Sequence, residues 1–189
     1  MNNPKPLVIA TVVNGIPLTF LSKSGLFSKG RLDEGTRVLL ENLILPEQGN
    51  VIDVGCGYGP IGIYIAKIKP QLKVYMVDIN PEAVKTTRTN VKLNNVEDRV
   101  IVLKSDMFSD VPKDITFKGI YSNPPLSKGR EFIEKLISEA YERLEINGII
   151  ELVVYKGEEI ALDLLRKTFS NAKLLKRSKG YNVVMAVKV

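Results

Sequence analysis

The chain has 189 residues, 44% of them hydrophobic and 25% charged, which predicts one globular domain with a buried core. It contains no histidine and a single cysteine, Cys56, which excludes Ser-His and Cys-His catalysis, internal disulfides and cysteine-based zinc sites, so no metal is expected. The formal net charge of +6 favours a polyanionic partner such as nucleic acid, although a lysine-rich solvated surface has the same charge.

Within this single domain, residues 1–48 are predicted to form a hairpin or flap and a helix ahead of the core at 49–189. Residues 7–13 and 16–21 are apolar runs rich in strand formers, and Asn14-Gly15 between them is typical of a tight hairpin. A segment punctuated by Gly and Ser follows at 22–30. We expect a helix to begin near Asp33, a candidate N-cap, and to end before Pro46. Its core-facing side chains are predicted to be Val38, Leu39, Leu40, Leu43 and Ile44.

From residue 49 to 189 the pattern alternates between strand and helix, which predicts a doubly wound α/β domain with a mostly parallel, Rossmann-like sheet. Strands are expected near 50–54, 72–78, 99–104, 118–122, 148–154, 172–177 and 182–188. Helices are expected near 60–68, 81–93, 130–144 and 157–169. The connection at Ser178-Lys179-Gly180 is too short for a crossover helix, so the last of the seven strands must run antiparallel to its neighbour.

A glycine-rich turn follows the first strand of this domain, where ligands of open parallel sheets bind. Gly55, Gly57 and Gly59 permit a tight turn and close approach of a ligand to the backbone. Their spacing, G-x-G-x-G, differs from the dinucleotide fingerprint, and a plain tight turn remains an alternative. Asp53, just before the glycines, is expected either to hold the loop or to face a cofactor amino group.

Acidic residues also end the next two strands. Asp78, followed by Ile79, stands about 20 residues beyond the glycines and can accept hydrogen bonds from both hydroxyls of a ribose. The alternative is a helix cap before Pro81, a role that Asn80 fills better. Asp106 can accept from an adenine amino group while Met107 packs beside the ring, or else it caps a turn.

The fourth strand leads into Asn123-Pro124-Pro125. The prolines fix φ and donate no backbone hydrogen bond, so the Asn123 amide and the Pro124 carbonyl are set in fixed positions. Two acceptors can hold an amine conjugated with a ring so that its lone pair faces a methyl carbon, a chemistry in which positioning does most of the work. The alternative is a rigid strand-to-loop turn.

These motifs resemble those of the class I S-adenosylmethionine-dependent methyltransferases, and more narrowly the ribosomal RNA small-subunit guanine-N2 methyltransferases and their single-domain archaeal relatives. The stretch from Gly25 to Arg37 is similar to the segment that folds over the cofactor in that group. The resemblance implies S-adenosylmethionine as the cofactor. It implies cofactor contacts for Asp33, Gly35, Gly55, Gly57, Gly59, Asp78, Asp106 and Asn123, and target-amine contacts for Asn123 and Pro124.

The chain departs from that group in two respects. Many amino-directed relatives have an aromatic residue after Asn-Pro-Pro that stacks on the target base, whereas this chain has Leu126. The aromatic face could instead come from Tyr121, Phe27, Phe132 or Tyr181. The bacterial ribosomal enzymes also have an additional degenerate domain, so RNA docking is expected to depend on this domain's own surface, a dimer or a partner.

Basic residues are expected to gather at the same edge of the sheet and to contact RNA phosphates. They are Lys128, Arg130, Lys156, Arg177 and Lys179 with Tyr181, joined by Lys23, Lys29 and Arg31 from the flap. The function predicted is N-methylation of an exocyclic RNA amine, with guanine N2 in ribosomal RNA preferred over transfer RNA. The alternatives are methylation of a protein glutamine and a non-catalytic cofactor-binding scaffold for RNA.

No apolar run approaches the ~20 residues of a membrane span, and the N-terminus lacks the apolar core of a signal peptide. We therefore expect a cytoplasmic protein with no membrane partner. The sequence favours neither a monomer nor a homodimer.

Overall fold

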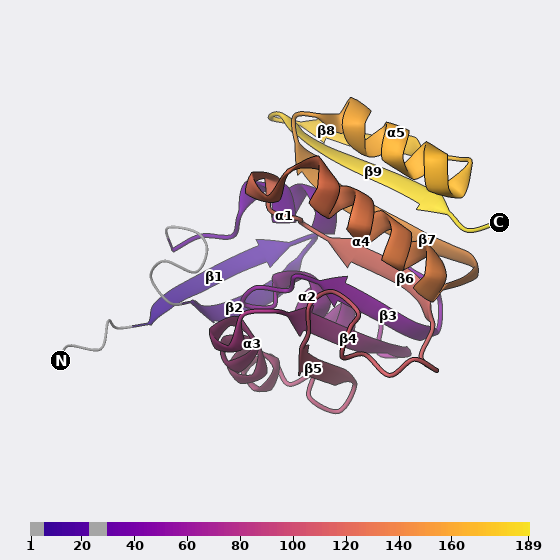
Figure 1. Cartoon of the computed structure of the whole chain (residues 1–189). Helices are drawn as coiled ribbons and strands as arrows, with labels where there is room; N and C mark the ends of the chain where they lie inside the picture. Colours follow the sequence, from indigo (N-terminus) through magenta and orange to yellow (C-terminus); the bar gives the residue numbers. More distant parts are fainter. Residues whose placement is uncertain (1–5, 23–29) are drawn as a thin grey trace.

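A computed structural model of the chain describes residues 6–22 and 30–189, apart from the side chain of Leu126. Its main feature is a seven-stranded sheet with the order β5-β4-β3-β6-β7-β9-β8 (Figure 1). The strands are β3 (Gly49–Val54), β4 (Leu72–Asp78), β5 (Val100–Lys104), β6 (Phe117–Ser122), β7 (Leu144–Tyr155), β8 (Lys173–Ser178) and β9 (Tyr181–Val187). The helices are α1 (Glu34–Leu40), α2 (Pro60–Ile68), α3 (Pro81–Leu93), the 3-10 turn η1 (Leu126–Lys128), α4 (Gly129–Arg143) and α5 (Glu158–Phe169).

The sheet is parallel except at β9, which runs antiparallel to both of its neighbours, β7 and β8. The predicted seven-stranded, mostly parallel sheet with an antiparallel last strand is therefore confirmed. The reversal from β8 to β9 takes only two residues, Lys179 and Gly180, with φ of 51° and 84°. Glycine adopts a φ of 84° without steric cost, which explains the place of Gly180 in this turn.

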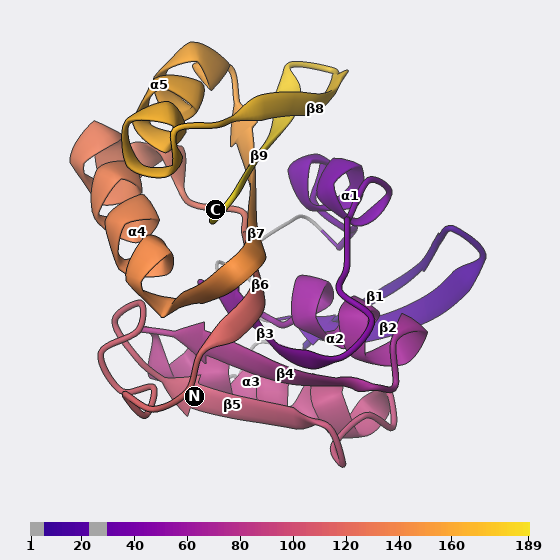
Figure 2. The ribbon, with the colours of Figure 1, turned by 90° about the vertical axis from the view of Figure 1, so that its right-hand side faces the viewer.

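Helices cover both faces of the sheet (Figure 2). Helices α4 and α5 pack on one face over a core that includes Ile137 and Leu165. Helices α1, α2 and α3 lie on the other face, over a separate core that includes Leu39 and Ile65. The two layers leave the carboxyl ends of the parallel strands open to a ligand.

The hairpin of β1 (Leu7–Val13) and β2 (Ile16–Ser22) packs on the α1–α3 layer, as its place in Figure 1 shows. Asn90 of α3 and Asn94, the residue that caps the C-terminus of this helix, bind the backbone of the hairpin. Asn90 accepts from Leu21 N–H at 2.8 Å and donates to the carbonyls of Leu21 and Tyr58 at 2.9 and 2.7 Å. Asn94 donates to the Thr19 carbonyl at 2.8 Å. The edge of β2 thus finds side-chain partners in place of a third strand.

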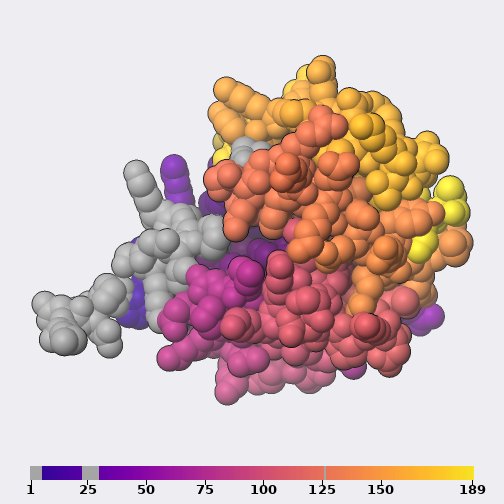
Figure 3. All heavy atoms as spheres, viewed as in Figure 1, coloured from indigo at the N-terminus to yellow at the C-terminus, as the bar shows by residue number. Residues whose placement is uncertain are grey.

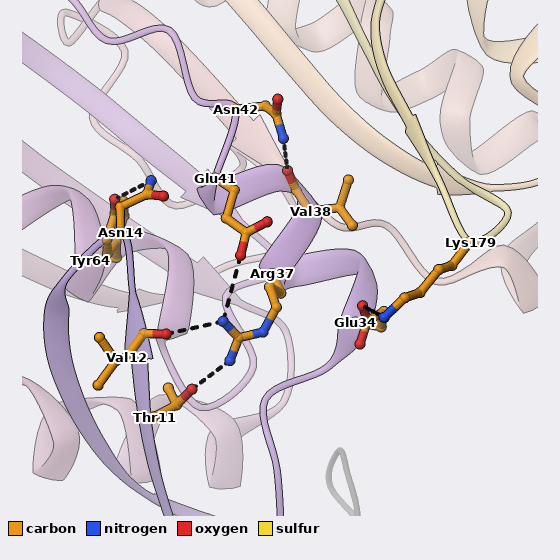
Figure 4. Close-up of polar contacts among 10 residues, drawn as sticks. All are labelled: Thr11, Val12, Asn14, Glu34, Arg37, Val38, Glu41, Asn42, Tyr64 and Lys179. Carbon is orange, nitrogen blue, oxygen red and sulfur yellow. Dashed lines mark hydrogen bonds and ion pairs between the residues drawn. The ribbon is translucent and has the colours of Figure 1, made fainter.

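Helix α1 joins the hairpin to the sheet (Figure 4). Arg37 donates to the Val12 carbonyl at 3.0 Å and to Thr11 Oγ1 at 2.6 Å, and it forms an ion pair with Glu41. Asp33 caps the helix by accepting from Thr36 N–H at 2.8 Å, as predicted.

The predicted length of α1 was wrong, because the helix ends at Leu40 and leaves Leu43 and Ile44 outside it. Ile44 is bound instead by two buried side chains of the sheet. Its N–H donates to Glu151 Oε1 at 2.8 Å, and its carbonyl accepts from the Tyr121 hydroxyl at 2.7 Å. These tertiary bonds hold the segment in an irregular connection between α1 and β3.

Strand β7 also begins earlier than expected, at Leu144, directly after α4. Within the described part of the chain, no helix is long and apolar enough to span a bilayer.

Candidate functional site

A cavity of about 540 Å³ opens at the carboxyl ends of β3, β4, β5 and β6. Figure 3 shows a hollow between the orange atoms of α4 and the magenta atoms beneath them. Its volume lies in the range of small-molecule sites. The predicted site residues that line it are Asp33, Gly55, Gly57, Asp78, Ile79, Asp106, Met107, Asn123, Pro124, Pro125, Lys128 and Tyr181.

The glycine turn forms one wall of the cavity. The N–H groups of Gly55 and Cys56 both donate to the Val77 carbonyl, at 2.8 and 2.9 Å, which fastens the turn to β4. Gly55 has a φ of 74°, and a Cβ added to it would meet no atom within 4 Å. The turn therefore presents bare backbone to open space, where a ligand can approach closely. Gly59 does not line the cavity; it precedes α2 with a φ of 102° and packs against Ile63.

Asp78 stands at the end of β4 with its carboxylate beside the glycine turn. Its Oδ2 accepts from Gly57 N–H and its Oδ1 from Asn80 N–H, both at 2.9 Å. Each carboxylate oxygen has a further lone pair that can accept from a ligand. Asn80 caps α3 by accepting from Glu82 N–H, so Asp78 is not the helix cap.

Asp53 lies beneath the site, fully buried, and does not line the cavity. Its Oδ2 accepts from Gly62 N–H at 3.0 Å, at the first turn of α2. Burial raises the pKa of Asp53 to about 7, and the nearby Asp78 carboxylate adds to this effect. Of the two roles predicted for Asp53, holding the loop agrees with this position, and direct contact with a cofactor does not.

Asp106 and Met107 follow β5 and line the side of the cavity next to α4. Asp106 is half exposed and forms an ion pair with Lys135 of α4 at 3.3 Å. Met107 is buried and has a φ of 50°, a conformation held by the Ser105 hydroxyl, which donates to the Met107 carbonyl at 2.8 Å. The pair thus offers an acceptor beside an apolar surface.

Two hydrogen bonds hold the side chain of Asn123 at the cavity. Its Nδ2 donates to Asp33 Oδ2 at 2.9 Å and to Thr36 Oγ1 at 3.0 Å. A carboxylate only accepts, so the amide nitrogen must face Asp33. The Oδ1 atom is left as the acceptor available to a ligand. The sequence analysis missed Thr36, although it stands three residues after the predicted cap.

Two tyrosine rings lie together at the rim, where the end of β7 pairs with the start of β9. The rings of Tyr155 and Tyr181 both line the cavity, with centroids 4.9 Å apart. Gly35 does not line the cavity, but it makes room for this arrangement, because a Cβ there would lie 2.7 Å from the Tyr181 ring. The sequence analysis missed Tyr155, which ends the last parallel strand.

The other aromatic candidates differ in position. Phe132 of α4 also lines the cavity. Tyr121 cannot present a face to a ligand, because it is fully buried and its hydroxyl is bound to Ile44. Phe27 lies outside the described residues.

The predicted basic residues that the structure describes differ in whether an acidic side chain neutralises them. Arg177 forms an ion pair with Glu158 at 2.7 Å, and Lys179 forms one with Glu34 at 2.8 Å (Figure 4). Lys128 lines the cavity, whereas Arg130, Arg177 and Lys179 do not. Lys23 and Lys29 lie outside the described residues.

Comparison with known proteins assigns the chain to a family. Residues 17–185 match the model of the methyltransferase small domain. The chain belongs to this family. Within it, the chain is 35% identical over 174 residues to YbxB of Bacillus subtilis (strain 168), covering 90% of this chain and 86% of YbxB. It is 34% identical to ribosomal RNA small subunit methyltransferase C of Hamiltonella defensa, covering 86% of this chain.

The fold of this methyltransferase is similar to that of the T. thermophilus 16S rRNA N2 methyltransferase RsmC, solved in complex with AdoMet and guanosine. The TM-score is 0.86 with 26% identity, and the match covers 96% of this chain. The chain spans about half the length of that structure and of the small subunit methyltransferase C from H. defensa (50% and 48%). The family and this similarity identify the chain as an S-adenosylmethionine-dependent methyltransferase.

The cavity of the methyltransferase fits this cofactor. Of the described residues that line it, three are carboxylates, Asp33, Asp78 and Asp106, and one is a cation, Lys128, a balance that suits a ligand with an ammonium and a sulfonium group. We expect Asp78 to accept from the ribose hydroxyls, Asp106 and Met107 to face the adenine, and the turn at Gly55 to lie against the ligand. Among the described residues, no group of three or more His, Cys, Asp or Glu side chains is placed to hold a metal ion.

Proposed function

We propose that this methyltransferase modifies an exocyclic base amine in RNA, namely guanine N2 in ribosomal RNA. The observation that carries the proposal is the amide of Asn123, whose nitrogen is held by Asp33 and Thr36 so that its oxygen is left as an acceptor on the cavity. An acceptor fixed in this way suits an amine with two N–H donors. RsmC of T. thermophilus, which was solved with guanosine, supports the choice of base.

The residues of the site would act mainly by positioning. S-adenosylmethionine, when bound, supplies a methyl group on a positively charged sulfur, which is an excellent leaving group. Asn123 Oδ1 and the Pro124 carbonyl would each accept one N–H of the amine and so aim its lone pair along the line of transfer. Such orientation can contribute several kcal/mol, up to ~10 kcal/mol. The amine becomes acidic after methylation and releases its proton to water, so no histidine is needed.

The rim of the cavity offers a surface for the target base. The rings of Tyr155 and Tyr181 provide an aromatic face in a chain that has Leu126 directly after Asn-Pro-Pro. Stacking of a base on an aromatic ring is worth about 1–3 kcal/mol and requires the base to leave its helix or loop stack. Lys128 and Arg130 at the start of α4 would then contact the flanking phosphates.

The proposal is tested with tritiated S-adenosylmethionine and three acceptors: bulk ribosomal RNA, bulk transfer RNA, and an extract of ribosomal proteins and release factors. Labelled RNA is digested to nucleosides. We expect label in N2-methylguanosine from ribosomal RNA. Label in glutamine would replace the proposal by protein methylation, and tight cofactor binding with no labelled acceptor would favour a non-catalytic scaffold.

A further inference from the structure

A second hollow of about 560 Å³ lies outside the cavity, on the exposed side of α3. It is lined by Pro81, Val84, Lys85, Arg88, Thr89, Lys92 and Lys104, and we call it the α3 groove. Four of these seven side chains are cations, and none is an acid. No residue of this groove was among the RNA contacts predicted from the sequence.

The spacing of the cations follows from the helix. Lys85, Arg88 and Lys92 are three and four residues apart, so they stand on one face of α3 and extend over about 10 Å of its length. Lys104 ends the neighbouring strand β5 and adds a fourth cation from across the groove. Arg88 is fixed between the two elements, since it donates to the Val102 carbonyl at 3.0 Å.

Within the described part of the chain, these cations differ from the basic residues near the β8–β9 turn in having no ion-pair partner. Arg177 and Lys179 are each paired with a glutamate, whereas Lys85, Arg88, Lys92 and Lys104 form no ion pair with any other described residue. Four like charges around one concave surface raise the local potential and attract a polyanion.

The α3 groove begins near the carboxyl edge of the sheet, where the cavity opens. Lys104 pairs with Asp78 in the register of β4 and β5, and it directly precedes Ser105 and Asp106 of the cavity wall. Pro81, at the other side of the groove, follows the cavity residue Ile79 by two positions. A strand that delivers one base to the cavity can therefore continue into the groove.

We propose that the α3 groove binds the phosphates of the RNA strand next to the target nucleotide. This inference rests on the proposed function, because it takes RNA as the substrate. The contacts are to phosphate rather than to base edges, since lysine and arginine here face a groove with few other polar groups. They supply affinity and orientation without sequence preference.

The test is a charge reversal of two lysines, Lys85→Glu with Lys92→Glu, and it leaves Arg88 in place to keep α3 attached to β5. A matched control, Lys113→Glu with Lys173→Glu, makes the same charge change in the turn before β6 and at the first residue of β8, away from the carboxyl edge of the sheet. Binding of a fluorescently labelled single-stranded RNA of mixed sequence is measured by anisotropy over a series of salt concentrations. Calorimetry with S-adenosylmethionine and a thermal melt show that each variant is folded and keeps its cofactor site.

We expect the groove variant to bind RNA at least about tenfold more weakly than wild type, and its salt slope to fall by about 0.7 for each phosphate that it no longer neutralises. The control variant is expected to keep an RNA affinity and a salt slope near those of wild type. If the groove variant loses no more affinity than the control, the groove is not the docking surface, and the proposed function stands. If wild-type protein neither binds nor methylates RNA, the proposed function fails together with the inference. Equal binding of polyglutamate and RNA by the wild type would overturn the assignment of the groove to RNA.

Discussion

At the scale of single residues, Asn123 shows how a neutral side chain can be made into a directed acceptor. An isolated amide can turn either end toward a ligand, but Asp33 and Thr36 bind the nitrogen end of this one. Asp33 has two tasks, because the same Oδ2 atom accepts from Thr36 N–H and so begins α1. The start of a helix and the orientation of the amide therefore depend on one carboxylate.

Replacing Asn123 by Ala is expected to lower kcat about 100-fold, because the target amine loses an acceptor that orients it. Cofactor affinity is expected to change by no more than about twofold, since the glycine turn and Asp78 are untouched. Single-turnover kinetics and calorimetry measure the two quantities. Near-normal turnover would remove Asn123 from the role of orienting the amine.

Asp33→Ser separates the two tasks of Asp33. Serine is about as good a helix cap as aspartate, so the free energy of unfolding should change by less than about 1 kcal/mol. The shorter hydroxyl no longer reaches the Asn123 amide, and kcat is expected to fall about tenfold at saturating cofactor. Chemical unfolding and steady-state kinetics test this split. If kcat is unchanged while the Kd of the cofactor rises, Asp33 acts on the cofactor rather than on Asn123.

Much of the cavity could be predicted from the sequence because strand ends are recognisable. Asp78, Asp106 and Asn123 each follow an apolar run, and parallel strands bring their carboxyl ends to one edge. Thr36 and Tyr155 were missed because their places depend on tertiary contacts, with Asn123 and with Tyr181. Asp53 was ambiguous for the same reason, since only the fold shows that its partner is Gly62.

At the scale of elements, two asparagines connect the hairpin to the α/β domain. Asn90 is fully buried and bridges the β2 backbone and the Tyr58 carbonyl of the glycine turn. The hairpin and the turn are therefore coupled through one side chain of α3. A buried amide with three hydrogen bonds cannot be removed without leaving its partners unpaired.

Asn90→Ala is consequently expected to lower the free energy of unfolding by about 3 kcal/mol or more. The exposed neighbour Thr89→Ala is the control and should change it by less than about 0.5 kcal/mol. Urea unfolding measures both variants. Equal midpoints for Asn90→Ala and wild type would show that the hairpin is held by its apolar side chains alone.

Element types could be predicted from periodicity and turn residues, whereas some boundaries could not. Leu43 and Ile44 continue the apolar pattern of α1, yet hydrogen bonds with Glu151 and Tyr121 hold Ile44 outside the helix. These partners are distant in sequence, so local propensity carries no sign of them.

At the scale of the whole molecule, two buried carboxyl groups link stability to pH. Burial raises the pKa of Glu151 to about 8 and that of Asp53 to about 7, both above the values of an exposed acid. At a pH between the ordinary carboxyl pKa values of the unfolded chain and these raised values, the folded protein keeps two protons that the unfolded chain has released. The stability that these groups contribute is fully present at acidic pH, before the unfolded chain ionises, and is lost as the pH rises through the two folded-state values.

Glu151→Gln mimics the protonated acid and is expected to flatten this dependence. The melting temperature of the variant relative to wild type should rise steadily from about pH 5 to about pH 8. The pH dependence of stability that remains in the variant comes from Asp53 and other groups. Parallel curves for the two proteins across that range would show that Glu151 ionises in the folded state as an ordinary acid.

The single cysteine of the chain, Cys56, offers a way to detect whether the cavity is occupied. Cys56 is buried in the cavity wall, with its sulfur 3.7 Å from the Thr87 hydroxyl, and burial raises its pKa well above the usual value. Alkylation at neutral pH should therefore be slow and confined to one position. The alkylation rate of Cys56 should therefore report whether the cavity is occupied, because a molecule that fills the cavity shields the sulfur. Intact-mass measurements can determine the protected fraction without a label on either the protein or the ligand.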